Sequence, residues 1–403
     1  MSHSIEHSKQ KFIFLLSVTA IYVALLAGLN FLQGPFWADE GAFWRTSLTF
    51  SDRLIPTIES ISDYNELNTP LPFIVFGFLE YLFGQGIVAG RLLNIVLSIG
   101  IVFVIGWPRK RGHDGRMLCA LGLLMCPYYL LFSGRLYTEM IACAFAILGF
   151  ASYVRDRHLL SCIAFILAIS SRQYMLAFPV AIATYEFGGL LIQILSPRNS
   201  EQFKSQGFQW QHQWRWVAPT VAALSILVWF FLFKGLAPEA ATAIRKTPEV
   251  QKTALALLPG VSVNFLAIVG AYIVIPEFML FQPVTKLKSI KTHWRRLVFT
   301  AFCCLLLFLI VPPEPSTRGP ISQVTGLLPT EGLKLALLYG LTLLTCMRFY
   351  RPNLVTFIIV FNSLMMMKAY PWDKYVVPVA VVLWYLKSIG FEERVRALRR
   401  AVD

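Results

Sequence analysis

The chain alternates long apolar runs with short polar stretches that are rich in Lys and Arg. A helix that crosses a bilayer needs roughly 20 apolar residues, and the pattern predicts about twelve such spans, several of them short. The expected ranges are 12–32, 91–107, 118–133, 138–154, 159–171, 174–195, 216–233, 259–283, 297–312, 332–347, 353–367 and 375–388. The predicted fold is therefore all-α, a polytopic transmembrane helical bundle that forms one domain over residues 1–403.

One further apolar run, Leu71 to Phe83, is short for a span and contains Pro72 and Glu80. Its length suits a helix that lies along the membrane interface. With this run kept out of the membrane, about two thirds of the 36 Lys and Arg residues fall on one side. The positive-inside rule assigns that side to the cytoplasm. Residues 33–90 then form a first outer loop with juxtamembrane helices, and 234–258 and 313–331 also lie outside.

Composition supports a membrane protein and excludes several other classes. Hydrophobic residues make up 56% of the chain and charged residues 14%, with a mean hydropathy of +0.61. Soluble domains carry about 25% charged residues. The net charge of +14 follows from the basic inner loops, so it does not indicate nucleic-acid binding. The seven cysteines lie inside apolar runs without metal-ligand spacing, which predicts neither a disulfide framework nor a zinc site.

The first chemical signal is the acidic pair Asp39 and Glu40 in the segment QGPFWADEGAFWR, just after the first apolar run. Flanking aromatic residues are expected to hold this loop at the headgroup level. None of the six histidines falls in a predicted outer loop, so an outward-facing base has to be Asp or Glu. A partly desolvated carboxylate is expected to have a raised pKa and to act as a general base. The alternative is a solvated pair of loop residues.

Charged residues also stand at the outer corners between spans. They are Arg135 and Glu139 in SGRLYTEM, Arg172 and Gln173 in SSRQYML, and Lys368 and Lys374 in MKAYPWDKY. Such residues often only anchor helix ends at the interface. The positive-inside bias opposes outer cations, however, so a cluster of them facing carboxylates suits a phosphate leaving group and a base. Segment 233–252 would cover this site as a lid or be an ordinary loop.

No metal site is predicted, because two adjacent carboxylates, with Glu139 as a conceivable third, are a weak ligand pattern. A divalent cation stays open as a cofactor. The chain lacks a Gly-rich phosphate loop, so ATP or a nucleotide sugar gains no support as substrate.

Several short segments together resemble the GT-C superfamily of polyprenyl-phosphate-sugar-dependent membrane glycosyltransferases. WADEGAFW, NTPLPFIVFG, the RLLN run at 91–94, LYTEM and SRQYM carry the resemblance. Within the superfamily, the closest resemblance is to the dolichyl-phosphate-glucose α-1,2-glucosyltransferase family, to which the Arg-Gln corner points. The chain departs from that family where Phe43 and Trp44 replace a His and where segment 233–252 lacks an Asp and a His.

The resemblance implies transfer of a hexose from a polyprenyl phosphate to an acceptor hydroxyl on the extracytoplasmic or lumenal face. Asp39 would be the base, Glu40 would orient the acceptor or a cation, and Arg135, Arg172, Lys368 and Lys374 would be phosphate partners. A single in-line displacement would invert the anomeric centre. The partners implied are a lipid-linked sugar donor, a glycan, glycolipid or protein acceptor, and membrane lipid. A bacterial inner membrane is favoured over the endoplasmic reticulum.

Three other functions fit parts of the pattern. A transporter or flippase of lipid-linked sugars fits the hydrophobicity and outer cations, but many transporters carry internal repeats, and none is visible here. A polysaccharide polymerase or ligase would typically carry a large late outer loop, whereas those here are short. A non-catalytic membrane scaffold would tolerate substitution of Asp39 together with Glu40.

Overall fold

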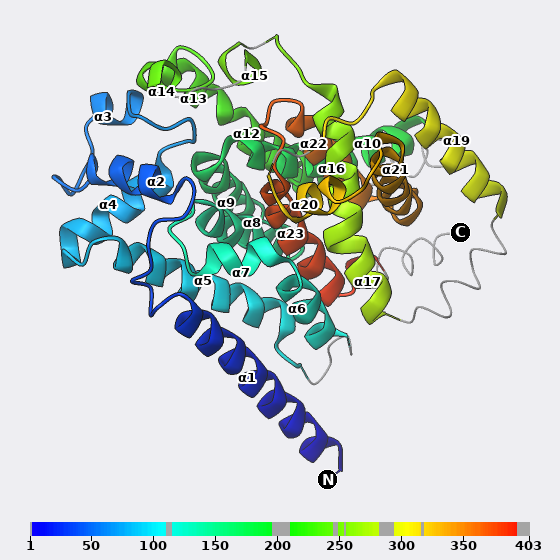
Figure 1. The fold of residues 1–403 in the computed structure, drawn as a ribbon, viewed down its shortest axis with the longest axis horizontal. Helices are drawn as coiled ribbons and strands as arrows, with labels where there is room; N and C mark the ends of the chain where they lie inside the picture. Colours follow the sequence, from blue (N-terminus) through cyan, green and yellow to red (C-terminus); the bar gives the residue numbers. More distant parts are fainter. Residues whose placement is uncertain are drawn as a thin grey trace.

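The computed structural model describes residues 2–109, 115–195, 210–244, 249–253, 255–281, 294–315 and 318–392. Within these ranges the chain is helical, with one isolated bridge between Arg318 and Trp372 and no β-sheet. The prediction of an all-α fold is confirmed. Figure 1 shows the helices gathered into one bundle, from which α1 projects at the N-terminal end.

The first third of the chain builds one edge of the bundle and its outer loop. Its helices are α1 (Ser2–Gly28), α2 (Glu40–Leu48), α3 (Ile58–Ser62), α4 (Leu71–Phe83) and α5 (Ile87–Gly106). The predicted interfacial helix is confirmed as a helix with the expected bounds, and Gly84 ends it in the left-handed conformation. Gly77 lets α4 approach α2 closely, because a Cβ there would lie 2.5 Å from the carbonyl oxygen of Ser47.

The middle of the chain contributes the central helices. They are α6 (Arg116–Leu124), α7 (Pro127–Ser133), α8 (Glu139–Tyr153), α9 (His158–Ser171), η1 (Gln173–Leu176), α10 (Ala177–Leu195), α12 (Trp210–Leu224) and α13 (Ile226–Phe233). Helices α6 and α7 are bent by 79° at the break before Pro127. Pro127 removes a backbone donor, which is the usual cause of such a bend.

The last part of the chain closes the bundle. Its elements are α14 (Glu239–Ile244), α15 (Glu249–Lys252), α16 (Pro259–Val269), η2 (Gly270–Val274), α17 (Ile275–Leu280), α19 (Trp294–Ile310), α20 (Pro320–Gly326), α21 (Glu331–Arg348), α22 (Leu354–Met366), η3 (Asp373–Val376) and α23 (Val377–Ser388). The π-helical turn η2 lies where α21 comes closest, since a Cβ on Gly270 would lie 2.3 Å from the carbonyl oxygen of Leu341.

Five helical segments in the described part are long and apolar enough to cross a membrane, or six if the bent pair α6–α7 is one span. They are Ser8–Gly28, Ile87–Gly106, Gln173–Ile192, Gln213–Phe233 and Pro259–Leu280. Several of these helices keep large apolar side chains exposed, as Phe12 on α1 and Phe231 on α13 do. These features fit a membrane protein, whereas the expected count of about twelve spans stays a prediction.

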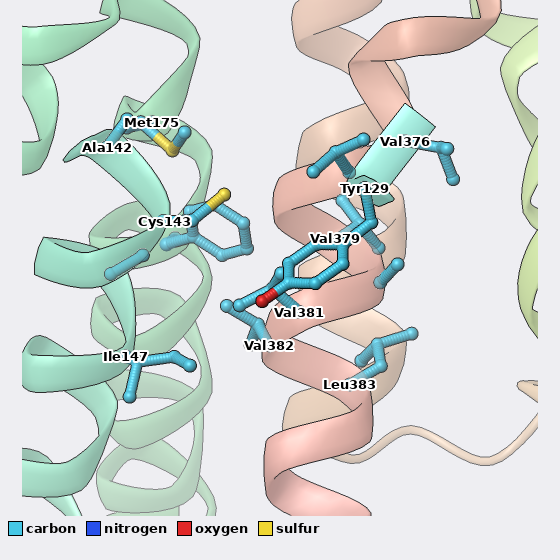
Figure 2. Close-up of a cluster of buried hydrophobic side chains, with 14 of the residues drawn as sticks. Tyr129, Ala142, Cys143, Ile147, Met175, Val376, Val379, Val381, Val382 and Leu383 are labelled. Carbon is cyan, nitrogen blue, oxygen red and sulfur yellow. The ribbon is translucent and has the colours of Figure 1, made fainter. Parts of the chain in front are cut away.

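One part of the buried core lies between α8 and α23, where small and branched side chains pack together. Figure 2 shows Ala142, Cys143 and Ile147 of α8 facing Val379 and Val382 of α23. All five are buried. This packing holds the two helices together along their length. It therefore also fixes the positions of the residues at their ends.

Ion pairs at one end of the bundle join the ends of helices that lie far apart in the sequence. Glu277 of α17 accepts hydrogen bonds from Arg348 of α21 at 2.7 and 3.0 Å and from Lys387 of α23 at 2.8 Å. Arg116, at the start of α6, donates to the carbonyl of Ser388 at 3.3 Å. In the predicted topology, each of these helices has its Lys- and Arg-rich cytoplasmic loop at this end of the bundle. The contacts agree with that topology, and we call this end the basic-loop end.

Candidate functional site

The opposite end of the bundle is built around the buried ion pair of Glu40 and Arg91. The Nε of Arg91 lies 2.7 Å from Oε1 of Glu40, and its Nη2 lies 2.7 Å from Oε2. Neither side chain is more than 2% exposed. A two-point arginine–carboxylate contact of this kind fixes orientation as well as distance.

Further hydrogen bonds fill the remaining positions around this pair. The backbone amides of Leu136 and Trp37 donate to Glu40 at 2.7 and 3.1 Å. Arg91 also donates to the carbonyls of Leu32 at 2.6 Å and Gly34 at 2.7 Å, which wraps the loop before α2 around the guanidinium. Arg135 adds a longer contact to Glu40 at 3.5 Å. Glu40 therefore holds the first outer loop against α5 and the corner at 134–138.

Asp39 has a different environment from its neighbour. Its Oδ2 accepts a hydrogen bond from Nζ of Lys374 at 2.9 Å. The side chain of Asp39 is 29% exposed, whereas that of Lys374 is 3% exposed. The ammonium group favours the ionised carboxylate, which is the form that a general base requires. Asp39 thus combines access from outside with a buried cation behind it.

Aromatic rings enclose Lys374. Its Nζ lies 3.8 Å from the ring centroid of Trp372, 5.5 Å from that of Tyr137 and 5.8 Å from that of Tyr375. Burial lowers the pKa of Lys374 from its usual value, and the charges of Glu139 and Asp39 oppose this shift only in part. A second anion beside Lys374 would be stabilised strongly, because little water competes for the ammonium group.

A second buried pair, Glu139 and Arg172, joins the start of α8 to the end of α9. Arg172 donates to Glu139 and to the side-chain carbonyl of Asn68, and both Arg172 and Glu139 are nearly fully buried. Gln173 donates to the carbonyl of Leu67 at 2.7 Å. The segment NTPLPF (68–73), which leads into α4 and is called the proline step below, is therefore tied to the corner formed by Arg172 and Gln173, the Arg-Gln corner.

Lys368 lies apart from this cluster. Its ammonium group donates to the carbonyls of Val250, Thr253 and Ala256 at 3.2, 2.7 and 2.5 Å. It thus holds the segment that follows α15, so these contacts give it a structural role. The predicted phosphate partners are brought together except for this residue. Segment 233–252, expected to be a lid or an ordinary loop, contains α14, where the amide of Ala240 donates to Asp63 of the outer loop at 3.0 Å. Residues 245–248 of this segment lie outside the described residues.

The sequence analysis did not single out Arg91 and Asp373, although both are charged residues of this end. Arg91 was noted only as part of the RLLN run, although a basic residue near the outer start of a span needs a buried partner. Asp373 is fully buried and accepts from Tyr272 at 3.1 Å and from the amide of Ile321 at 3.0 Å. In both cases the sequence places an ionisable residue next to an apolar run, at the predicted outer end of a helix. This position could have identified both as candidate site residues.

The arrangement suits acid–base and anion chemistry. Asp39 offers an accessible carboxylate, and Lys374 offers a basic group in surroundings of low polarity. In the part of the chain that the structure describes, no group of three or more His, Cys, Asp and Glu side chains is placed to hold a metal ion. The carboxylates of residues 39, 40 and 139 instead each face a basic side chain.

Comparison with protein-family models, with curated proteins and with solved structures finds no match to this chain.

Proposed function

We propose that the chain is a membrane glycosyltransferase of GT-C type. It transfers a hexose from a polyprenyl-phosphate sugar to an acceptor hydroxyl at the extracytoplasmic or lumenal face. The observation that carries this proposal is the contact between Asp39 and Lys374, an accessible carboxylate against a buried ammonium group. The choice of a lipid-linked hexose rests on the family resemblance.

In this proposal the donor phosphate changes the partner of Lys374. Before the donor binds, Lys374 neutralises Asp39. A phosphate that reaches the ammonium group competes for it and releases the carboxylate, which then accepts the proton of the acceptor hydroxyl. The acceptor oxygen attacks the anomeric carbon, the bond from that carbon to the phosphate oxygen breaks, and the phosphate leaves with the electron pair. Base assistance of this kind is worth about 10²–10⁴-fold.

The other residues of the cluster position this pair. Glu40 and Arg91 fix the loop that carries Asp39, and Glu139 and Arg172 fix the corners on either side of Lys374. This assigns Glu40 a positioning role, in place of the contact with the acceptor that the resemblance implies. Arg135, 13% exposed beside Glu40, is a further cation from which a phosphate oxygen would accept a hydrogen bond.

The setting proposed is a bilayer, with about twelve helices passing through it or into it and the Asp39 end outside. Five helices of spanning length support membrane insertion. The bacterial inner membrane is the proposed location, and the endoplasmic reticulum is the alternative.

The decisive experiment supplies the purified protein with a panel of radiolabelled polyprenyl-phosphate hexoses and an acceptor extract. The proposal expects release of polyprenyl phosphate with at least one donor, and a labelled acceptor in equal amount. Movement of intact lipid-linked sugar across proteoliposomes without release of the phosphate would instead establish a flippase and contradict the proposal.

A further inference from the structure

A cavity near the opposite end of the bundle has no part in the proposed reaction. It encloses about 550 Å³ between α5, α8 and the end of α23. This volume falls within the range of about 300–1,000 Å³ that is usual for small-molecule sites. The cavity is lined by the faces of α5 around Gly100 and of α8 around Ala144, and its charged residues are Arg109, Arg116 and Arg155.

The walls of this cavity are apolar, and it opens toward the side of the bundle. Val96 and Val104 on α5 are 58% and 39% exposed, and Leu148 on α8 is 41% exposed. Gly100 leaves the middle open, because a Cβ there would meet no atom within 4 Å. The segment from Val96 to Val104 rises about 12 Å. That length is close to the hydrocarbon depth of one leaflet, which is about 15 Å.

The charges of the cavity lie at one end and have one sign. No acidic residue lines it among the described residues. Arg116 is buried, and it donates hydrogen bonds to the carbonyls of Trp107, Val104 and Ser388. Arg109 and Arg155 are exposed at the same end, where α5 stops and α8 has just ended. Such a site has a positive mouth at headgroup depth and an apolar body within the leaflet.

We propose that this groove binds an anionic phospholipid of the surrounding membrane. One acyl chain lies against Gly100 and Ala144, and the phosphate meets Arg109 and Arg155. Under the predicted topology the site faces the cytoplasmic leaflet, whose surface is negative. A free phosphate ion would use the arginines but leave the apolar body empty, and a zwitterionic lipid would fill the body without matching the charge. The inference does not depend on the proposed reaction.

Native mass spectrometry of the whole, delipidated protein in neutral detergent tests this inference. Dioleoyl phosphatidylglycerol and dioleoyl phosphatidylcholine are titrated in parallel. We expect one phosphatidylglycerol to bind at least tenfold more tightly than phosphatidylcholine, and about 10 mM inorganic phosphate to leave it bound. Equal affinity for the two lipids, or displacement by phosphate alone, would overturn the proposal.

Two exposed arginines of one loop give a matched pair of variants. Arg155 lines the groove, whereas Arg157 does not. Arg155→Gln is expected to weaken phosphatidylglycerol binding about fivefold and to leave phosphatidylcholine binding unchanged, while Arg157→Gln changes neither. Equal losses in both variants would show a diffuse charge effect and reject the site.

Gly100→Leu provides a test that does not depend on charge. Leucine favours a helix, and a Cβ at this position meets no atom within 4 Å. We expect a protein of unchanged thermal stability that binds the lipid at least tenfold more weakly. Unchanged lipid binding in this variant would place the lipid outside the groove.

Discussion

At the scale of single residues, the environment separates the two neighbouring acids. Asp39 occupies the cap position of α2 and Glu40 is its first residue, so their side chains leave the backbone in different directions. One is fully buried against Arg91, whereas the other is 29% exposed against Lys374. One carboxylate therefore has a positioning role, and its neighbour has the proposed chemical role.

Replacing Glu40 with Gln should destabilise the protein. The amide lacks the charge and one acceptor, so Arg91 would stay buried without a full partner. We expect a loss of about 3–5 kcal/mol in the free energy of unfolding, measured by thermal unfolding in detergent. Glu59→Gln, on the exposed face of α3, serves as control and should change the value by less than about 0.5 kcal/mol. Equal stability of both variants would contradict the role given to Glu40.

The lowered pKa of Lys374 predicts the pH dependence of activity. Lys374 binds phosphate only when protonated, so kcat/KM for the donor should fall as the pH rises through the lowered pKa of the free enzyme. Lys374→Arg keeps the charge at high pH and should abolish this alkaline limb. Lys334→Arg, on partly exposed α21, should leave it unchanged. An alkaline limb that persists in Lys374→Arg belongs to another group.

The same shift affects stability with a definite sign. Between the lowered pKa and the usual value of 10.5, the unfolded chain binds a proton that folded Lys374 has released. The contribution of this residue to stability therefore rises with pH in that window. Unfolding measured at increasing pH should show this rise in the wild type and its absence in Lys374→Met.

At the scale of elements, the short segments noted in the sequence interlock. The acidic pair meets the RLLN run through Glu40 and Arg91, and the proline step meets the Arg-Gln corner through Asn68 and Arg172. Asn94 of the RLLN run also donates to the carbonyl of Tyr137 at 2.9 Å. Each segment therefore depends on another for its position.

The positions of many helices were predictable from the sequence, because apolar runs mark helices. The predicted run at 71–83 matches α4, and the ranges 138–154 and 159–171 match the helices α8 and α9 to within a residue or two. Both helices are shorter than the segments long enough to cross a membrane, so their crossing stays a prediction. The bend between α6 and α7 was missed, since its apolar pattern is continuous across Pro127. Pairing was not predictable, because charge alone does not say whether Lys368 faces an anion or the carbonyls of Val250 and Thr253.

Lys368 should hold the segment after α15 in a defined conformation. Replacing it with Gln removes the ammonium donor shared by three carbonyls, so amide hydrogen exchange within 249–258 should accelerate. Turnover should fall less than in Lys374→Gln, because Lys368 lies outside the cluster. Unchanged exchange in Lys368→Gln would show that other contacts hold this segment.

At the scale of the whole molecule, two sets of buried or half-buried ion pairs lie at opposite ends of one bundle. Helix α5 joins them, with Arg91 near its start and the carbonyls that bind Arg116 near its end. Its 20 residues span about 30 Å, which is the thickness of a bilayer core. The ends are therefore expected to face opposite sides of the membrane.

Cysteine labelling in intact cells tests this arrangement. An impermeant maleimide applied from outside should label Asp52→Cys in the first outer loop, whereas Arg157→Cys should react only after permeabilisation. The protein with native cysteines alone gives the background. Labelling of both positions from the same side would reject the predicted topology.

Loss of charge at the basic-loop end should affect stability but not chemistry. Glu277→Gln removes the carboxylate shared by Arg348 and Lys387, at a cost of about 1.5–3 kcal/mol in unfolding free energy. The folded fraction should keep the wild-type kcat/KM for the donor, because Asp39 and Lys374 lie at the other end. A fall in kcat/KM as large as that of a site variant would contradict this separation.

The most direct test of the account compares wild type with Asp39→Asn for release of polyprenyl phosphate from the donor that the wild type uses. The asparagine keeps the shape of the side chain but cannot accept the acceptor's proton. We predict that kcat falls about 10²–10⁴-fold, with unchanged membrane insertion. The loss of stability should be smaller than that of Glu40→Gln, because Asp39 is 29% exposed and the asparagine oxygen still accepts a hydrogen bond from Lys374. Full turnover by a correctly folded Asp39→Asn protein would contradict the assignment of Asp39 as the base.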